Sequence, residues 1–422
     1  MVSGVSFVRF YFNVFRLGAS TCLQLDPNGD VRASKLSVVA VVPVLAIFAY
    51  NSYDVASNSL TLERTQTFLS ILAVIPPIIL CVLCTFGQLM NLRPFSEAMK
   101  ALAICDTHLK LPRSILFYPV CEFLAISVQN ALTVYVAYAA VRSRPPTLEE
   151  IDRMESFKTF ERDESEIEWE TFKATVPLLL QWSFIFSSSM QYCCLVNTIG
   201  QFFYQLNRKL SSQSQMIEDS LRCYHSLIYA SQIIDECYGP IMLVVFGSCF
   251  ALIGHAAVGL MQTSMQVKPV DLLIQQSRMI PILTLLVPLP LYVAHKCEKT
   301  ANQAGEFNVI LNELALSDTR QYLTRNELVN LHFSSYKPLS FTACQCFEVN
   351  YKLAIKIIVA LGAAVFYSIA NSRMAQAADM LGGQGAGGGF WNNGSDPFLN
   401  STLWDAIDID DDGSIDFGFT SI

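Results

Sequence analysis

The chain alternates between long apolar runs and shorter polar segments. A helix needs about 20 predominantly apolar residues to cross a bilayer, and seven runs reach or approach that length. They are apolar on nearly every side, without the polar face of a soluble surface helix. The runs cover residues 36–53, 68–90, 115–141, 174–203, 238–261, 279–295 and 353–370. This pattern predicts an all-α membrane protein with seven transmembrane helices.

Two prolines in the second run and three in the sixth predict kinks in those helices, because neighbouring helices can satisfy the freed carbonyls. The residues are Pro76, Pro77, Pro281, Pro288 and Pro290.

The N-terminal segment, residues 1–35, does not indicate a signal peptide. Arg9 and Arg16 interrupt its early apolar positions, and no long apolar stretch with a small-residue cleavage site follows. We expect an amphipathic segment that precedes the first span.

A second amphipathic stretch, residues 301–338, lies between the sixth and seventh runs. Its apolar residues recur at helical spacing, with a break near Ser317 and Asp318. The stretch predicts one or two helices, whose apolar faces pack on the other helices of the bundle or on neighbouring subunits.

The composition agrees with a membrane protein and excludes several other classes. The chain is 52% hydrophobic and only 15% charged, with a mean hydropathy of +0.38, whereas soluble domains are about 25% charged. The net charge is −8. This composition excludes a disordered chain, a secreted disulfide scaffold and a nucleic-acid-binding protein.

The charges are unevenly distributed. With the N-terminus inside, Lys and Arg are more numerous in the inner segments than in the outer ones, as the positive-inside rule requires. The C-terminus then lies outside, where Asn393 and Asn400 begin glycosylation sequons. The same orientation disfavours a G-protein-coupled receptor.

The acidic outer segment 142–172 is either a solvated loop or a negative vestibule that concentrates cations near a pore.

The C-terminal tail, residues 373–422, is glycine-rich and then acidic. Its spacing resembles an EF-hand calcium loop, but Phe419 stands where that loop needs a bidentate Glu. The tail is therefore either a disordered acidic segment or a weak calcium site. The candidate ligands are Asp408, Asp410, Asp412 and Asp416.

No motif indicates catalysis. A glycine-rich phosphate loop, an H-E-x-x-H pair and a nucleophile elbow are all missing from the sequence. Cys81 and Cys84 have CxxC spacing but lie inside an apolar run, which favours buried thiols over metal or redox chemistry. No internal repeat suggests a transporter. We expect no enzymatic activity and no cofactor.

The segment before the last apolar run carries a family resemblance. It reads Phe341-Thr342-Ala343-Cys344 and then Phe347-Glu348-Val349-Asn350-Tyr351. This resembles the seventh-helix signature of arthropod gustatory receptors, which share a superfamily with insect odorant receptors. The chain departs from the family in residues 365–372, which lack the usual Thr-Tyr-x-x-x-x-Gln, and in its long tail.

The resemblance implies a tetrameric, ligand-gated, nonselective cation channel in the plasma membrane, with the N-terminus inside. Residues 1–35 form the cytoplasmic lead-in, 36–300 hold the first six spans, 301–352 form a cytoplasmic anchor between subunits, and 353–372 line the pore. The partners would be a small organic tastant, the lipid bilayer and identical or related subunits. The alternatives are an odorant-receptor subunit that needs a coreceptor, and a non-channel adaptor or trafficking factor of the same fold.

Polar and aromatic groups inside the spans are the candidate functional residues. For the ligand pocket these are Asn130, Tyr135, Gln181, Trp182 and His255. Hydrogen bonding between helices is the alternative role for each. For the pore, the outer end of the seventh helix offers Tyr367, Ser368, Ile369 and Asn371. Small polar rings can coordinate cations, and apolar rings can gate by dewetting.

Overall fold

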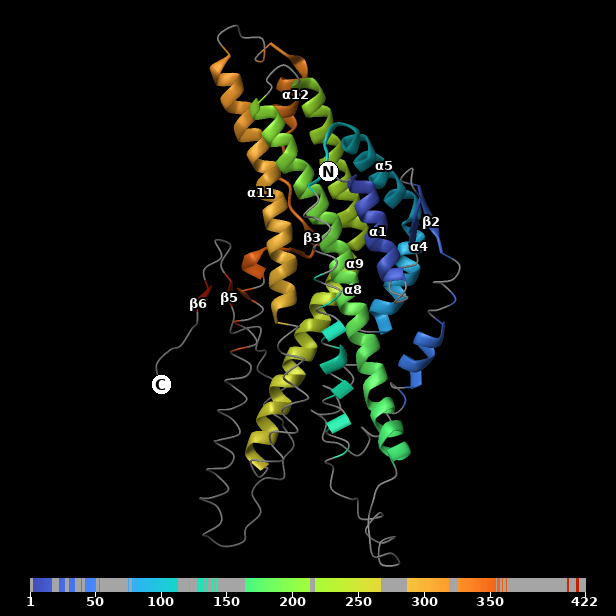
Figure 1. Ribbon diagram of the computed structural model, residues 1–422. Helices are drawn as coiled ribbons and strands as arrows, with labels where there is room; N and C mark the ends of the chain where they lie inside the picture. Colours follow the sequence, from blue (N-terminus) through green and yellow to red (C-terminus); the bar gives the residue numbers. More distant parts are fainter. Residues whose placement is uncertain are drawn as a thin grey trace, which may run out of the picture. The chain divides into compact units, whose positions relative to one another are not determined.

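The computed structural model divides the chain into two units, Met1–Ile369 and Ala370–Ile422. The described part of the first unit is mostly helical, as the apolar pattern predicts (Figure 1). The description of this unit covers residues 3–16, 23–26, 30–34, 42–50, 78–112, 164–212, 217–266, 287–318 and 325–353, with isolated positions at 39, 53, 75 and 323, within 121–142 and within 355–362. In the second unit it covers residues 408–409 and 415–416.

The N-terminal segment forms helix α1 (Gly4–Arg16) and an antiparallel hairpin of β1 (Leu23–Leu25) and β2 (Val31–Ala33). Helix α1 is amphipathic, as expected, because Val8 is fully buried while Phe10 is 47% exposed. The hairpin was not expected from the pattern. Its sequence signal is the turn-forming tripeptide Pro27-Asn28-Gly29 between the two strands.

Three long helices form the centre of the first unit. They are α8 (Glu164–Ser212), α9 (Ile217–Gln266) and α11 (Pro288–Ser317). They lie side by side in Figure 1, and α8 contacts both α9 and α11. Helices α8 and α9 extend well beyond the fourth and fifth apolar runs, toward the short connection between them.

The structure describes only the end of the sixth run, residues 287–295, so the predicted kink stays a prediction. Helix α11 as described begins at Pro288, so Pro288 and Pro290 lie in its first turn. Proline is tolerated there because the first N–H groups of a helix have no partner within it. The other predicted kink positions, Pro76, Pro77 and Pro281, lie outside the described residues.

The second apolar run ends in a bent helix. Its last part contains a π-helical turn, η1 (Leu83–Gly87), and α4 (Gln88–Met90), and it meets α5 (Leu92–His108) at an angle of 70°. Within the described residues, this bent pair and the stretch Ile217–Gly254 of α9 are long and apolar enough to cross a membrane. They overlap the second and fifth predicted spans, and the other spans stay predictions.

The amphipathic stretch 301–338 forms parts of two helices, which confirms the break predicted near Ser317. Helix α11 ends at Ser317, and α12 (Glu327–Ser335) begins after Asn326. The Asn326 side chain caps α12 by accepting the N–H groups of Leu328 and Val329. Strands β3 (Thr342–Ala343) and β4 (Phe347–Glu348) then form a hairpin.

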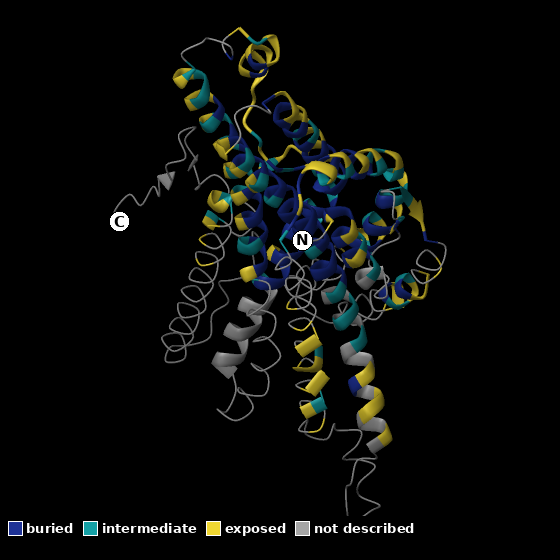
Figure 2. Ribbon diagram, turned by 45° about the horizontal axis from the view of Figure 1, so that its top comes forward, coloured by how far each residue is buried: buried dark blue, intermediate teal, exposed yellow. Residues whose placement is uncertain are grey.

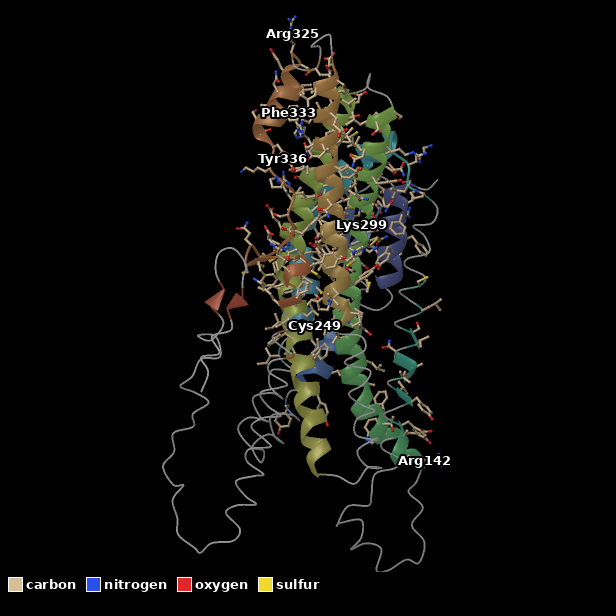
Figure 3. The ribbon with its side chains drawn as sticks, turned by 90° about the vertical axis from the view of Figure 1, so that its left-hand side faces the viewer. Arg142, Cys249, Lys299, Arg325, Phe333 and Tyr336 are labelled. Carbon is tan, nitrogen blue, oxygen red and sulfur yellow. The ribbon has the colours of Figure 1, made fainter. Side chains whose placement is uncertain are left out.

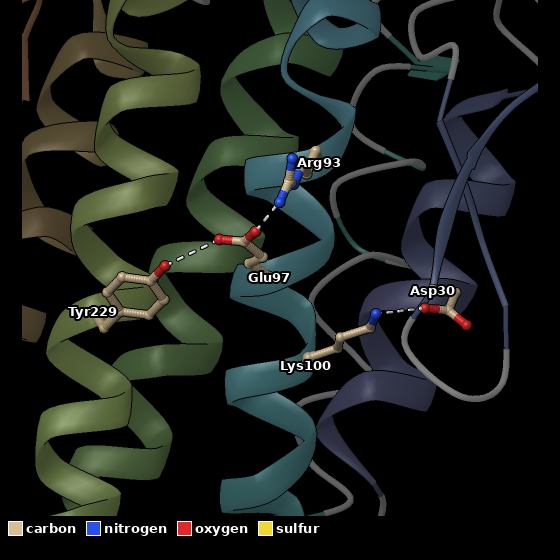
Figure 4. Close-up of polar contacts among 5 residues, drawn as sticks. All are labelled: Asp30, Arg93, Glu97, Lys100 and Tyr229. Atoms are coloured by element: carbon tan, nitrogen blue, oxygen red, sulfur yellow. Dashed lines mark hydrogen bonds and ion pairs between the residues drawn. The ribbon is translucent and has the colours of Figure 1, made fainter.

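Polar surface contacts link helix α5 to α9 and to the N-terminal hairpin (Figure 4). The Tyr229 hydroxyl of α9 donates to Glu97 at 3.1 Å, and Glu97 also pairs with Arg93 at 3.6 Å. On the other side, Lys100 lies 3.0 Å from Asp30, which precedes β2. Exposed pairs of this kind add little stability, so they orient α5 while its buried face holds it to the bundle.

Candidate functional site

The β3–β4 hairpin stands directly before the predicted pore helix. Thr342 pairs with Glu348 across the two strands, and the N–H of Val349 donates to the carbonyl of Phe341 at 2.8 Å. The helical residues that begin at Tyr351 follow at once. The hairpin therefore joins the helical bundle to the segment in which we predict the pore.

Asp235 of α9 binds the hairpin through two donors of a single residue. Its carboxylate accepts the backbone N–H of Thr342 at 2.9 Å and the Thr342 hydroxyl at 2.8 Å. The hydroxyl of Tyr192, on α8, donates to the same carboxylate at 3.4 Å. A half-buried carboxylate is costly unless it is hydrogen-bonded. The hydrogen bonds from Thr342 therefore stabilise the hairpin in its position against Asp235.

Aromatic rings extend this joint across the bundle. Phe12 of α1 lies 5.7 Å from Phe95 of α5, measured between ring centroids, and Phe95 lies 6.3 Å from Tyr238 of α9. Tyr238 lies 5.9 Å from Tyr192, which meets Phe341 edge-on at 6.4 Å. All five rings are buried, and the core around them is the dark blue centre of Figure 2. An unbroken row of rings thus connects the N-terminal helix with the hairpin.

Helix α11 holds the start of the last helical segment. Glu298 accepts the backbone N–H of Tyr351 at 3.1 Å, and a ring nitrogen of His295 is hydrogen-bonded to the Tyr351 hydroxyl. An open pocket of about 440 Å³ lies here, on the stretch of α11 that carries Lys299 in Figure 3. Its other lining residues are Asn302, Gln303 and Glu306.

Polar groups connect α8 to α11 beside this pocket. Lys296, only 6% exposed, donates to Asn197 at 3.3 Å. One turn further on, the Thr300 hydroxyl donates to the carbonyl of Val196 at 3.0 Å. The backbones come close at Gly200, where an added Cβ would lie 2.5 Å from the Thr300 hydroxyl oxygen. Small residues and interhelical hydrogen bonds are typical of helix contacts in membrane proteins.

A second set of polar contacts, centred on Asn308, joins α9, α11 and α12. The amide of Asn308 donates to the Tyr224 hydroxyl at 3.1 Å, and its oxygen lies 2.5 Å from Nε2 of His332. The rings of Tyr224 and Phe307 are stacked at 4.4 Å. Burial, together with nearby His225, lowers the pKa of His332 to about 4. His332 is therefore neutral at physiological pH.

The structure leaves the predicted ligand pocket largely untested. Asn130 and Tyr135 have helical backbone, with Asn130 half-buried and Tyr135 70% exposed. Gln181 and Trp182 belong to α8 and His255 to α9, but their side chains lie outside the described residues. The pocket therefore stays a prediction.

Most of the predicted pore and tail residues also lie outside the part of the chain that the structure describes. The pore candidates Tyr367, Ser368, Ile369 and Asn371 and the sequon residues Asn393 and Asn400 lie outside the described residues. Of the predicted calcium ligands, Asp408 and Asp416 face each other across strands β5 (Asp408–Ile409) and β6 (Ile415–Asp416), and Asp410 and Asp412 are not described. No group of three metal-binding side chains occurs among the described residues. Calcium binding stays a prediction.

Sequence reasoning missed the joint formed by Asp235, Tyr192 and Glu298. A signal for Asp235 was present, because an acidic residue directly before an apolar run needs a polar partner when it is buried. Nothing in the sequence identifies that partner as Thr342, which is 107 residues away. The prediction that Cys81 and Cys84 are buried thiols is confirmed, since both are free and buried. The other ten described cysteines are also free thiols.

Comparison with known proteins gives two kinds of match. A family model described as 7tm chemosensory receptor matches residues 33–369. The olfactory receptor OR5 of the insect Machilis hrabei has a similar structure, with a TM-score of 0.57 and 14% identity over 86% of this chain and 97% of that chain. The same receptor in complex with eugenol gives a TM-score of 0.52 and 12% identity over the same shares. No curated protein sequence matches this chain.

Proposed function

Because the chain belongs to the 7tm chemosensory receptor family, as the match over residues 33–369 shows, we propose that it forms a ligand-gated, nonselective cation channel for small organic tastants, of the gustatory-receptor type. The family match confirms the resemblance read from residues 341–351 and makes this a membrane receptor. It is the observation that carries the proposal, because it includes both the helical bundle and most of the predicted pore helix.

The proposed architecture has seven spans in the plasma membrane, with the N-terminus inside and the C-terminus outside. Four subunits, identical or related, surround a central pore lined by residues 353–372. Residues 1–35 and 301–352 lie on the cytoplasmic side, the latter as the anchor between subunits, and residues 373–422 lie outside. The fold likeness to OR5 supports this arrangement, and the uneven distribution of Lys and Arg supports its orientation.

In the proposed mechanism, a ligand binds among the outer halves of the second to sixth helices and displaces α8, α9 and α11. The candidate contacts are Asn130, Tyr135, Gln181, Trp182 and His255. Asp235 and Glu298, which hold Thr342 and Tyr351, pass that displacement to the pore helix, where Tyr367, Ser368, Ile369 and Asn371 contact the permeating ions. The complex of OR5 with eugenol supports a small organic ligand for this chain.

Ionic current tests the proposal directly. The full chain is expressed in cultured cells, its surface expression is confirmed, and whole-cell current is recorded during application of sugars, amino acids, bitter compounds and volatiles. Ligand-evoked cation current from this chain alone supports the gustatory type. Current only with a co-expressed coreceptor favours an odorant-receptor subunit. Silence in both settings favours a non-channel adaptor and overturns the proposal.

Glycosylation tests the orientation independently of the ligand. The outside C-terminus predicts that Asn393→Gln and Asn400→Gln each remove one glycan from the mature receptor. An unglycosylated tail, with a C-terminal epitope that is stained only after permeabilisation, places the tail inside and contradicts this topology.

A further inference from the structure

The turn of the β3–β4 hairpin has an unfavourable backbone conformation. Cys344 and Gln345 have φ angles of 55° and 59°, and among the described residues they are the only non-glycine residues with positive φ. The N–H of Cys346 donates to the carbonyl of Ala343 at 3.0 Å, which closes the turn. Positive φ at both central positions is the geometry of a type I′ turn, which is usually built from Asn and Gly. Cys and Gln at these positions cost conformational free energy.

Contacts with helix α9 hold the strained turn in place. Asp235 binds the backbone N–H and the hydroxyl of Thr342. One turn along α9, Gly239 lies so close to the hairpin that an added Cβ would be 2.9 Å from the backbone nitrogen of Cys344. Phe246, two turns further, meets Phe347 edge-on at 6.0 Å. One face of α9 therefore contacts both strands and the turn between them.

Backbone strain that is held by surrounding contacts clusters at active sites, ligand clamps and conformational switches. We propose that the β3–β4 hairpin is a two-state gating element, held by Asp235 and Gly239 of α9 in the conformation described above and driven away from it by the strain at Cys344 and Gln345. Asp235 is a positioning residue, because it acts on the pore helix only through Thr342. The gating role rests on the proposed channel function, whereas the two-state character of the hairpin does not.

Two sets of substitutions should shift the equilibrium in opposite directions. Asp235→Asn and Thr342→Val remove contacts that hold the described conformation, since an amide offers one acceptor where the carboxylate offers two and valine lacks the hydroxyl. Cys344→Gly and Gln345→Gly relieve the strain at positive φ and so favour the described conformation.

Dose–response recordings provide the first test. We expect Asp235→Asn and Thr342→Val to shift the half-maximal ligand concentration in one direction and the two glycine variants to shift it in the opposite direction, each by roughly five-fold or more. The ligand-independent current should likewise change in opposite directions in the two sets. The matched controls are Glu236→Gln, which removes an exposed carboxylate next to Asp235, and Thr342→Ser, which keeps the hydroxyl. Both should behave like the wild type. Shifts of the same sign in both sets, or an equal shift in Glu236→Gln, overturn the proposal.

Amide hydrogen exchange tests the hairpin without any current. In the purified full-length receptor, the N–H groups of Thr342 and Val349 are both hydrogen-bonded. Asp235→Asn should speed exchange in peptides covering the hairpin, and Gln345→Gly should slow it. Exchange rates unchanged by both variants overturn the two-state hairpin even if the channel conducts. A receptor that never conducts, but whose exchange rates change as expected, overturns the proposed function and supports the two-state hairpin.

Discussion

His332 of α12 and Asn308 of α11 lie 2.5 Å apart, measured from Nε2 to the amide oxygen. Because an amide oxygen only accepts, this contact places the proton on Nε2. The other ring nitrogen, Nδ1, is buried and has no hydrogen-bond partner among the described residues. A second proton on this ring would therefore be buried without an acceptor, next to the ring of His225 at 5.2 Å.

We predict that acidification weakens the junction of α9, α11 and α12. The pKa of His332 falls from 6.5 to about 4 on folding, so the unfolded chain binds a proton more readily than the folded one. The stabilisation is complete above about pH 6.5 and is lost progressively as the pH falls toward 4, at a cost of about 1–2 kcal/mol near pH 5. The measurement is the Tm of the purified receptor between pH 7 and pH 5. The drop should shrink in His332→Gln and persist in His108→Gln, which changes an exposed histidine.

Gly200→Ala should destabilise the contact between α8 and α11. Its Cβ would lie 2.5 Å from the Thr300 hydroxyl, which is already hydrogen-bonded to Val196. Overpacking at such a site costs about 1–3 kcal/mol. Thermal unfolding of the detergent-solubilised receptor measures the loss. Gly305→Ala on α11 is the control, since its Cβ would meet no atom within 4 Å and alanine is the better helix former. Equal effects of the two variants would contradict this account.

Glu298→Ala should loosen the start of the last helical segment. Glu298 accepts the backbone N–H of Tyr351 at 3.1 Å, and a hydrogen bond to a charged group contributes about 1.5–3 kcal/mol. Amide exchange should become faster in peptides that begin near Tyr351. Exchange in the rest of the chain should stay unchanged. Glu313→Ala removes an exposed carboxylate of the same helix and should leave those peptides unchanged. If it speeds their exchange as much as Glu298→Ala, the contact has no local role.

Trp182→Ala tests the predicted ligand pocket. A large aromatic side chain in a mostly apolar pocket contributes strongly to the binding of a small organic ligand. We expect the half-maximal ligand concentration to rise roughly ten-fold while surface expression is kept. Trp169→Ala is the matched control on the same helix, where Trp169 is 55% exposed and stacked on Phe172. An unchanged dose–response curve for Trp182→Ala removes that residue from the pocket.

Much of the architecture could be predicted because it depends on local patterns. The period of apolar residues in 301–338 predicted one or two helices with a break near Ser317, and α11 ends at that residue. The mixed pattern of residues 1–35 predicted an amphipathic segment, and its first part forms the amphipathic helix α1. The family resemblance was readable from residues 341–351 because a contiguous motif needs no knowledge of tertiary contacts. Local patterns did not reveal the π-helical turn at Leu83–Gly87 or the 70° bend that follows it.

The sequence by itself determined a helical membrane receptor of the chemosensory family, since helix length, apolar periodicity and a short motif are properties of neighbouring residues. Only the tertiary structure decided which polar groups meet. Asp235 binds Thr342 across 107 residues, and Lys296 binds Asn197 across 99. The physical reason is that a buried polar group must find a partner, but packing of the helices chooses which one. The positive φ angles at Cys344 and Gln345 were equally unreadable, because Cys and Gln are not the residue types that predict this backbone conformation.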